Sequence, residues 1–317
     1  MAIELVLGID IGGSLTKIGL VSREGEIFGK KVFPTQAHLP FSSFMELLKK
    51  EVNGLMANLD SKIKIMRIGV GAPNANPITG NIENPPNLKW KKTTPLAKTL
   101  KDCFNLEVTI ANDANAAALG EMMFGRAKGM KNFVVLTLGT GLGSGIIIQG
   151  KLLIGEHGAA GEIGHVSVDP NGRMCNCGLQ GCLETYASVT GIRRTVFELL
   201  ADRSEDSIMR AYSFEGLTGE HISKAALKGD IIALKAFEKT GEILGKKMAD
   251  TVAHIDPEAF ILSGGLSKAG DILLNPIKTS LQNSLFTTYK GKTKVLLSET
   301  TSEDAVLGPA ALAWMQI

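Results

Sequence analysis

The chain has 317 residues, enough for two domains, because single hydrophobic cores rarely grow beyond about 250–300 residues. Its 34 basic and 32 acidic residues are interspersed and leave a net charge of +2, which argues against nucleic acid or an anionic membrane as partner. No apolar run approaches the roughly 20 residues that span a bilayer, and the first residues lack the basic segment of a signal peptide. We therefore expect a cytoplasmic protein.

The first third of the chain alternates apolar, β-branched runs with turn signals, a pattern typical of an α/β sheet. Strands are expected over residues 3–11, 17–21, 27–33, 64–71 and 106–111. The first three form a meander of hairpins. A helix is expected over 42–59, where a serine is well placed as N-cap, and a short one from Thr94-Pro95. Residues 74–95, rich in Asn and Pro, predict a loop.

The middle of the chain repeats this plan. Residues 133–148 predict strand, glycine turn and strand, and 151–154 would add the third strand. An alanine-rich helix begins at Asp113, with Asn112 or Asp113 as its cap. The remaining elements are helices over 188–200, 230–254, from 269 and from 304, with strands over 259–262 and 295–297. The repeat predicts two similar α/β domains that face each other.

Three of the four cysteines lie in one segment, GEIGHVSVDPNGRMCNCGLQGCLE, between Gly161 and Glu184. Three thiols and one imidazole match the ligands of a closed tetrahedral zinc site. The ligands would be His165, Cys175, Cys177 and Cys182. A disulfide or ordinary buried thiols are the alternatives. The disulfide is disfavoured, because nothing indicates secretion and the first two cysteines are too close in sequence to pair comfortably.

Three glycine-rich turns follow strands, at residues 10–17 (DIGGSLTK), 139–143 (GTGLG) and 263–265 (SGG). Glycine lets backbone N–H groups approach an anion closely, and neighbouring hydroxyls add donors. Each turn alone fits an ordinary hairpin turn as well as it fits a phosphate site. Together the three favour a nucleotide phosphate site shared by two domains. Neither a P-loop nor a dinucleotide fingerprint is present, and the first turn opens a strand rather than a helix.

Two aspartates at strand ends are candidates for chemistry. Asp10 lies beside the first glycine turn, as a residue that holds Mg²⁺ through water would, although an Asx-turn is the alternative. Asp113 lies between a strand and a helix, with Asn112 and Asn115 beside it. A carboxylate there could accept a proton from an attacking hydroxyl, and a simple helix cap is its structural alternative.

The motifs DIGGSLTK, NDANAAALGE, LGTGLGSG, GEIGH and CNCGLQGCLE occur in this order and resemble the ROK family of bacterial sugar kinases and repressors over nearly the whole chain. The cysteine motif is the most specific of them. The resemblance implies the actin and hexokinase superfamily, a ribonuclease H-like duplication with a cleft between two similar domains. We expect residues 1–112 with a C-terminal helix over 304–317 to form the small domain, and 113–303 the large one.

The resemblance also implies ATP-dependent phosphorylation of a hexose, glucose at its 6-hydroxyl foremost, with Mg²⁺, structural Zn²⁺ and a homodimer. Asp113 would be the general base. The sugar would contact Gly71, Asn87, Asn112, Asp113, Glu162, His165 and Glu184. The nucleotide and its Mg²⁺ would contact Asp10, Gly12, Gly13, Ser14, Thr16, Lys17, Thr140, Gly141, Gly264 and Gly265. Zinc would bind the four ligands named above.

The chain departs from the family pattern in small ways. Ser14 stands where threonine is common, residues 71–74 lack the usual second glycine, and Ser263 replaces a frequent glycine. Other acceptors stay open, namely N-acetylglucosamine, N-acetylmannosamine, mannose or fructose, because the pocket around Asn74, Asn87 and Glu184 would decide between them. A sugar-responsive regulator is a further alternative, disfavoured by the near-neutral charge and by the lack of a DNA-binding segment ahead of the first strand.

Overall fold

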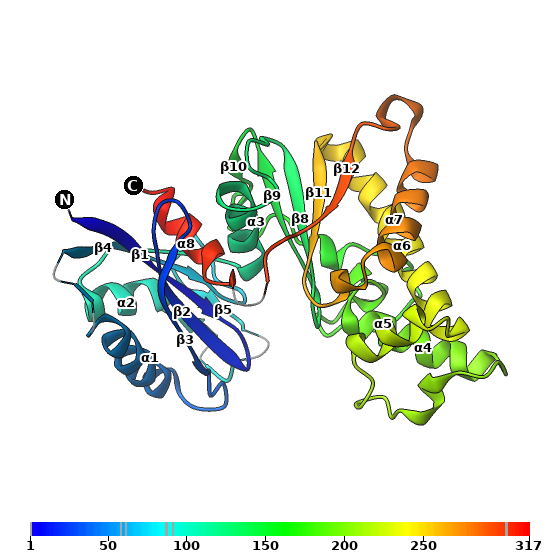
Figure 1. Cartoon of the computed structure of the whole chain (residues 1–317), viewed down its shortest axis with the longest axis horizontal. Coiled ribbons are helices and arrows are strands. Elements are labelled where there is room, and N and C mark those ends of the chain that lie inside the picture. Colours follow the sequence, from blue (N-terminus) through cyan, green and yellow to red (C-terminus); the bar gives the residue numbers. More distant parts are fainter. Residues whose placement is uncertain (1, 58, 61, 86–87, 91, 302–303) are drawn as a thin grey trace. The chain divides into compact units, whose positions relative to one another are not determined.

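The computed structural model describes residues 2–57, 59–60, 62–85, 88–90, 92–301 and 304–317 (Figure 1). The chain divides into two compact units. The first comprises Met1–Gly129, Lys151–Gly161 and Glu299–Ile317, and the second Met130–Gly150 and Glu162–Ser298. The described chain contains two five-stranded mixed sheets, so the predicted duplicated α/β fold is confirmed.

The first sheet has the strand order β3-β2-β1-β4-β7. Its strands are β1 (Ile3–Ile11), β2 (Leu15–Val21), β3 (Ile27–Pro34), β4 (Ile63–Gly71) and β7 (Val108–Ala111). The first three are antiparallel neighbours, and β1, β4 and β7 run parallel. Such parallel strands need cover on both faces, which explains the continuous apolar run of β1.

The two faces of β1 enter different cores, because successive side chains of a strand point to opposite faces. Leu5, Leu7 and Ile9 join the core formed with helices α1 (Phe41–Met56) and α2 (Leu96–Phe104). Val6 joins the core of the C-terminal helix α8 (Leu307–Trp314), which packs on β1 and β4 as the red helix beside the blue strands in Figure 1. The last helix of the chain thus completes the first sheet.

Close approach of α8 to the sheet depends on Gly69 in β4. A Cβ at this position would overlap the backbone carbonyl of Pro309, which cannot turn aside as a side chain can. We expect Gly69→Ala to lower the free energy of unfolding by about 3 kcal/mol, measured by urea titration. Gly29→Ala in β3 is the control, because its Cβ would meet only the tip of Leu55, at 3.0 Å. Equal stability of the two variants would contradict this packing account.

The second sheet repeats the first, with the order β10-β9-β8-β11-β12. Its strands are β8 (Phe133–Leu138), β9 (Leu142–Ile148), β10 (Lys151–Leu152), β11 (Ala259–Ser263) and β12 (Lys294–Leu297). Here too an antiparallel hairpin is followed by two parallel strands. The helices that follow in this part of the chain are α4 (Val189–Asp202), α5 (Gly219–Leu227), α6 (Ile231–Ile255) and α7 (Asp271–Ser284).

Helix α3 (Asp113–Met123) belongs to the first unit, whereas the sequence placed a domain boundary at residue 113. The reason is its packing partner, because α3 lies against α8. The two helices approach so closely that a Cβ added to Gly308 would lie 2.7 Å from the Ala116 carbonyl oxygen. Residues 151–161 and 299–301 likewise group with the first unit.

Local differences from the predicted elements are small. Helix α1 begins at Phe41 with Pro40 as its N-cap, so Ser42 lies inside the first turn and does not cap it. The segment predicted as loop holds a two-stranded sheet, β5 (Ile82–Glu83) with β6 (Thr93–Thr94). Helix α5 was not predicted.

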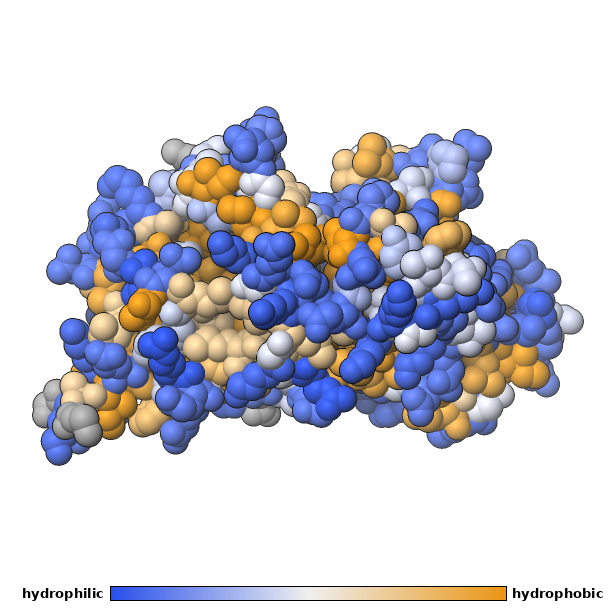
Figure 2. All heavy atoms as spheres, turned by 90° about the horizontal axis from the view of Figure 1, so that it is seen from above, coloured by the Kyte–Doolittle hydropathy of each residue, from blue (hydrophilic) through white to orange (hydrophobic). Residues whose placement is uncertain are grey.

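Helices that are both long and apolar enough to cross a bilayer do not occur in the described part of the chain. On the face drawn in Figure 2, hydrophilic and hydrophobic residues are interspersed.

Candidate functional site

The carboxyl ends of three parallel strands bring predicted residues of the first unit to one sheet edge. Asp10 in β1 lies opposite Gly71 in β4, and Gly71 lies opposite Ala111, the last residue of β7. Asn112 and Asp113 follow directly, at the start of α3. Ligand sites of open α/β sheets occur at such edges. Of the sugar-site residues predicted for this part of the chain, Asn87 lies outside the described residues.

Asn112 is the N-cap of α3, so the start of this helix does not depend on Asp113 alone. The Ala114 N–H donates to Asn112 Oδ1 at 2.8 Å, and also to Asp113 Oδ1 at 2.9 Å. Asp113 keeps access to solvent, although the surrounding protein weakens its solvation. This loss of solvation raises the pKa of Asp113 above its usual 3.8, against the lowering effect of the backbone N–H groups. A carboxylate with a raised pKa is a better base.

Asp10 forms an ion pair with Lys17 across the β1–β2 hairpin, with Lys17 Nζ 3.7 Å from Asp10 Oδ2. Burial raises the pKa of Asp10 to about 6 although Lys17 lowers it, and the negative charge of Asp113 raises it further. The negative charges of Asp10 and Asp113 therefore repel each other within the first unit. Neighbouring carboxylates beside a glycine turn suit a hard cation such as Mg²⁺.

Buried hydrogen bonds of Thr16 and Thr35 hold the first glycine turn. Thr16 is fully buried, its hydroxyl 2.9 Å from that of Thr35, and Thr35 Oγ1 donates to the Gly12 carbonyl at 2.7 Å. Thr16 therefore supports the turn from beneath, whereas Ser14 is exposed. A pocket of about 450 Å³ opens beside the turn. It is lined by Gly13, Ser14, Pro34, Gln36, Ala37, His38 and Lys89.

The other two glycine turns lie at one edge of the second sheet. Strands β8 and β11 are parallel, with Thr137 opposite Ser263, so the turns that follow them are neighbours. Gly264 has a φ of +92°, and a Cβ there would lie 2.6 Å from the Leu138 carbonyl, so only glycine fits. Thr140 and the Gly264-Gly265 backbone are exposed and can meet a ligand.

The cysteine loop gathers four ligand-bearing side chains in the second unit. The ligand atoms of His165, Cys175, Cys177 and Cys182 all lie within 4.8 Å of one another. Cys177 Sγ and Cys182 Sγ are 3.6 Å apart, and Cys175 Sγ lies 3.8 Å from His165 Nδ1. A tetrahedral zinc ion with bonds of about 2.3 Å would place its sulfurs about 3.8 Å apart. The cysteines are free thiols at these distances, and the cluster fits a structural zinc ion.

Burial raises the pKa of the Cys182 thiol to about 12 and also raises that of Cys175. Without a metal these thiols are protonated at neutral pH, so zinc binding must release protons and weakens in acid.

The predicted sugar carboxylates border this cluster. Glu162 precedes the 3₁₀ turn η1 (Ile163–His165), and its carbonyl accepts from the His165 N–H at 3.1 Å. Glu184 lies in the 3₁₀ turn η2 (Leu183–Thr185). Its Oε1 is 3.7 Å from Cys175 Sγ, and its Oε2 accepts from the Leu142 N–H at 2.9 Å. Glu184 therefore contacts both the cluster and the second glycine turn.

Arg173 is an important residue that the sequence did not single out. Its guanidinium donates to the Thr185 carbonyl at 2.6 Å, pairs with Glu198 in α4 and lies 4.4 Å from the Tyr186 ring. It thereby fastens the cysteine loop to η2 and α4. Nothing in the local pattern marks this arginine, because its partners follow it by 12 to 25 residues.

The family model of the ROK family matches residues 6–316, nearly the whole chain. The chain belongs to the ROK family. The glucokinase of Halalkalibacterium halodurans is 39% identical over 279 residues, which cover 86% of this chain and 83% of the relative. The glucokinase of Thermotoga maritima is 34% identical and covers 97% of this chain and 96% of its own. The predicted family is confirmed.

Solved ROK structures agree with the fold. A ROK glucokinase from Streptomyces griseus, in complex with glucose and AMPPNP, superimposes with a TM-score of 0.83 at 33% identity, covering 98% of this chain and 99% of that chain. ROK regulators are also similar. The xylose repressor of Caldicellulosiruptor bescii is 30% identical, and this chain covers 77% of its length.

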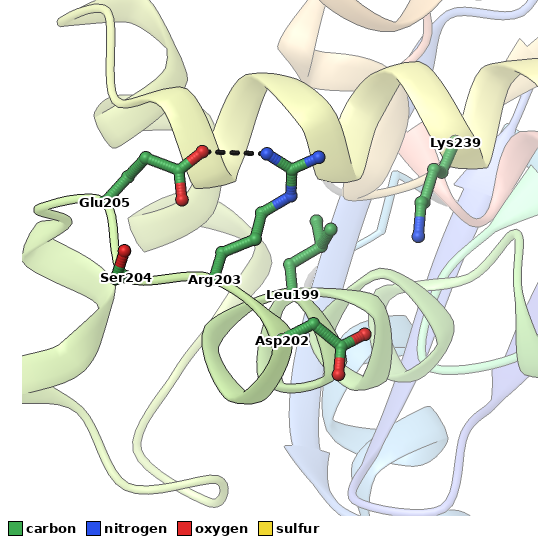
Figure 3. A pocket seen from close by; sticks show the side chains of 6 residues that line it. All are labelled: Leu199, Asp202, Arg203, Ser204, Glu205 and Lys239. Carbon is green, nitrogen blue, oxygen red and sulfur yellow. Dashed lines mark hydrogen bonds and ion pairs between the residues drawn. The ribbon is translucent and has the colours of Figure 1, made fainter.

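One pocket of the second unit contains none of the predicted residues. It measures about 430 Å³ and is lined by Leu199, Asp202, Arg203, Ser204, Glu205 and Lys239 (Figure 3). Arg203 and Glu205 pair at 2.7 Å, and acidic and basic groups largely balance. A pocket so neutralised offers no clear recognition of a charged ligand.

Proposed function

We propose that this ROK protein is an ATP-dependent sugar kinase with Asp113 as its general base and glucose as its preferred acceptor. The observation that carries the proposal is the pair Asp10 and Asp113 at one sheet edge, with Asn112 taking over the helix cap. A cap alone would not need a solvent-accessible second carboxylate. The similarity to kinases over 96% or more of their length supports the same reaction class.

In the proposed reaction the sugar hydroxyl oxygen forms a bond to the γ-phosphorus, and the bond to the bridging β–γ oxygen breaks. Asp113 accepts the hydroxyl proton, and ADP leaves with the electron pair. Asn112 keeps the start of α3 fixed, so the carboxylate is oriented before substrate arrives. Mg²⁺ would neutralise phosphate charge beside Asp10, whose carboxylate at the glycine turn suits a hard cation. The glycine turns would contribute backbone N–H groups to the phosphates and adenosine.

Zinc would have a structural role in this proposal, because three thiols and His165 fill all four positions of a tetrahedral site. It would orient His165, with Glu162 and Glu184 on either side, as a wall for the sugar.

A hexose panel at fixed Mg-ATP tests the proposal through sugar-dependent release of ADP, compared as kcat/KM. We expect glucose to have the highest value, ahead of mannose, fructose, N-acetylglucosamine and N-acetylmannosamine. If another sugar had the highest kcat/KM, the kinase activity would stand and glucose would be wrong as the preferred acceptor. Absence of ADP release with every sugar, together with sugar-dependent operator binding, would instead support a ROK regulator.

Asp10→Asn should reduce kcat/KM for Mg-ATP by about 10–100-fold, as loss of an indirect metal contact does. The pKa of Asp10 is about 6, so the wild-type KM for Mg-ATP should rise as pH falls below about 6 and the carboxylate takes up a proton. Asp102→Asn, which removes an exposed carboxylate of α2, is the control and should leave both values unchanged.

The stability of Asp10→Asn should not fall with its activity. Asp10 holds its proton up to about pH 6 when folded but only to about 3.8 when unfolded, so this group lowers stability as pH rises through that interval. Asp10→Asn should therefore melt no lower than wild type at pH 8, measured by calorimetry. A lower melting temperature there would contradict the role of Asp10 as a destabilised functional carboxylate.

A further inference from the structure

Residues on either side of the cysteine loop, His165–Cys182, bond the second glycine turn at two points and strand β9 just beyond it at a third. Ahead of the loop, the Ile163 N–H donates to Ser144 Oγ at 3.1 Å. Behind it, Glu184 Oε2 accepts from the Leu142 N–H at 2.9 Å, and the Val189 N–H donates to the Gly139 carbonyl at 2.9 Å. All of these residues belong to the second unit. Both ends of the turn, at Gly139 and Leu142, and Ser144 just beyond it are therefore bonded to residues that flank the loop.

Glu184 makes the charged contact among the three. A hydrogen bond from an N–H group to a carboxylate is roughly twice as strong as one between neutral groups. The carboxylate lies so close over Gly141 that a Cβ on that residue would overlap its Oε2. The other oxygen, Oε1, is 3.7 Å from Cys175 Sγ. One side chain thus lies against the cluster of His165 and three cysteines with one oxygen and against the turn with the other.

The backbone of Glu184 is fixed independently of its carboxylate. Ser188 Oγ donates to the Glu184 carbonyl at 2.7 Å, and Arg173 donates to the Thr185 carbonyl at 2.6 Å. Because the backbone that carries Glu184 is already fixed, less conformational freedom is lost when its carboxylate bonds the turn.

We propose that Glu184 is a positioning residue for nucleotide: it fixes the Gly139–Leu142 turn and so couples the cysteine loop to phosphate binding. This inference rests on the proposed kinase function, since it takes that turn to contact nucleotide phosphates. Glu184 can still accept hydrogen bonds from a sugar, because a carboxylate has about four acceptor positions and the Leu142 N–H uses one. The same residue then serves both substrates of the reaction.

Nucleotide binding without sugar separates this role from a sugar contact. Glu184→Ala should raise the Kd for ADP, measured by calorimetry in the absence of sugar, by about tenfold, as expected for loss of a charged hydrogen bond. Glu184→Gln keeps a side-chain oxygen acceptor and should raise it by less. Asp102→Asn is the control, because it removes an exposed carboxylate of the first unit without touching the turn or its supports, and it should leave the Kd unchanged.

Hydrogen exchange of the Leu142 amide, followed by NMR, reads the contact directly. Exchange should be slow in wild type and at least about tenfold faster in Glu184→Ala, with zinc content retained. Unchanged ADP affinity and unchanged Leu142 exchange in Glu184→Ala would overturn the proposal. Loss of zinc from Glu184→Gln with equally weakened ADP binding would also overturn it, by assigning the effect to the metal.

Failure of the kinase proposal gives a different result. A wild-type protein that binds no ADP contradicts the kinase, and with it the nucleotide role of Glu184. A protein that binds ADP equally well in all Glu184 variants contradicts only the positioning role.

Discussion

Asp113→Asn should lower kcat by about 10²–10⁴-fold while sugar affinity stays within a small factor of wild type. Asparagine has the size of aspartate but cannot accept the hydroxyl proton. The helix start should survive the change, because Asn112 Oδ1 already accepts from the Ala114 N–H. Steady-state kinetics at saturating Mg-ATP gives kcat, and calorimetry with sugar alone gives the affinity.

The pH dependence of kcat separates Asp113 from Asp10. Because poor solvation raises the pKa of Asp113, wild-type kcat should fall on the acid side at a pH above 3.8, where the base becomes protonated. The residual rate of Asp113→Asn should lack this acid limb. Asp10 instead acts on KM for Mg-ATP, so Asp10→Asn should retain the acid limb of kcat. Near-normal turnover of Asp113→Asn would remove Asp113 from the mechanism.

The sheets were predictable because their signals are local. Strands β1 and β8 are apolar runs that end in glycine turns, and this pattern survives in any tertiary context. The repeated order of elements then predicted the duplication. Helix α5 was not predicted because Gly219–Leu227 has only 9 residues, and so short an amphipathic segment is a weak signal.

Long-range packing could not be predicted from local pattern. Helix α3 follows β7 directly, yet its unit is decided by α8, which begins at Leu307. Thr16 looked like a phosphate ligand in the glycine motif, but its burial against Thr35 depends on a strand 19 residues away. The bonds of Arg173 and the Glu184–Leu142 contact have the same character, since each joins separate elements.

The candidate site shows the same limit. Its residue types were apparent from motifs, and the structure brings Asp10, Gly71 and Asp113 to one sheet edge. Which oxygen of which carboxylate is already engaged, however, follows only from tertiary geometry. Asn112 rather than Asp113 proved to be the cap that matters, and that distinction decides whether Asp113 can serve as a base.

Cys177→Ala should abolish stoichiometric zinc and raise the KM for sugar by about tenfold or more, with a smaller effect on kcat. Cys177 is exposed, so its truncation leaves no core cavity and the effect reports on the metal. Without zinc, His165 loses its link to the three thiols and the wall that contains Glu162 and Glu184 becomes less ordered. Elemental analysis gives the zinc content, and kinetics with varied sugar gives KM.

The controls distinguish metal loss from cysteine chemistry and from lost packing. Cys103→Ala removes the remaining cysteine, in the first unit, and should leave zinc content and KM unchanged. Cys182→Ala should lose zinc and also stability, because this thiol is 1% exposed and its removal opens a cavity. If Cys177→Ala lost its zinc yet bound sugar as wild type does, the metal would not be holding the sugar wall. Because Glu184 also holds Leu142, zinc loss should weaken ADP binding as well, by a factor no larger than that of Glu184→Ala.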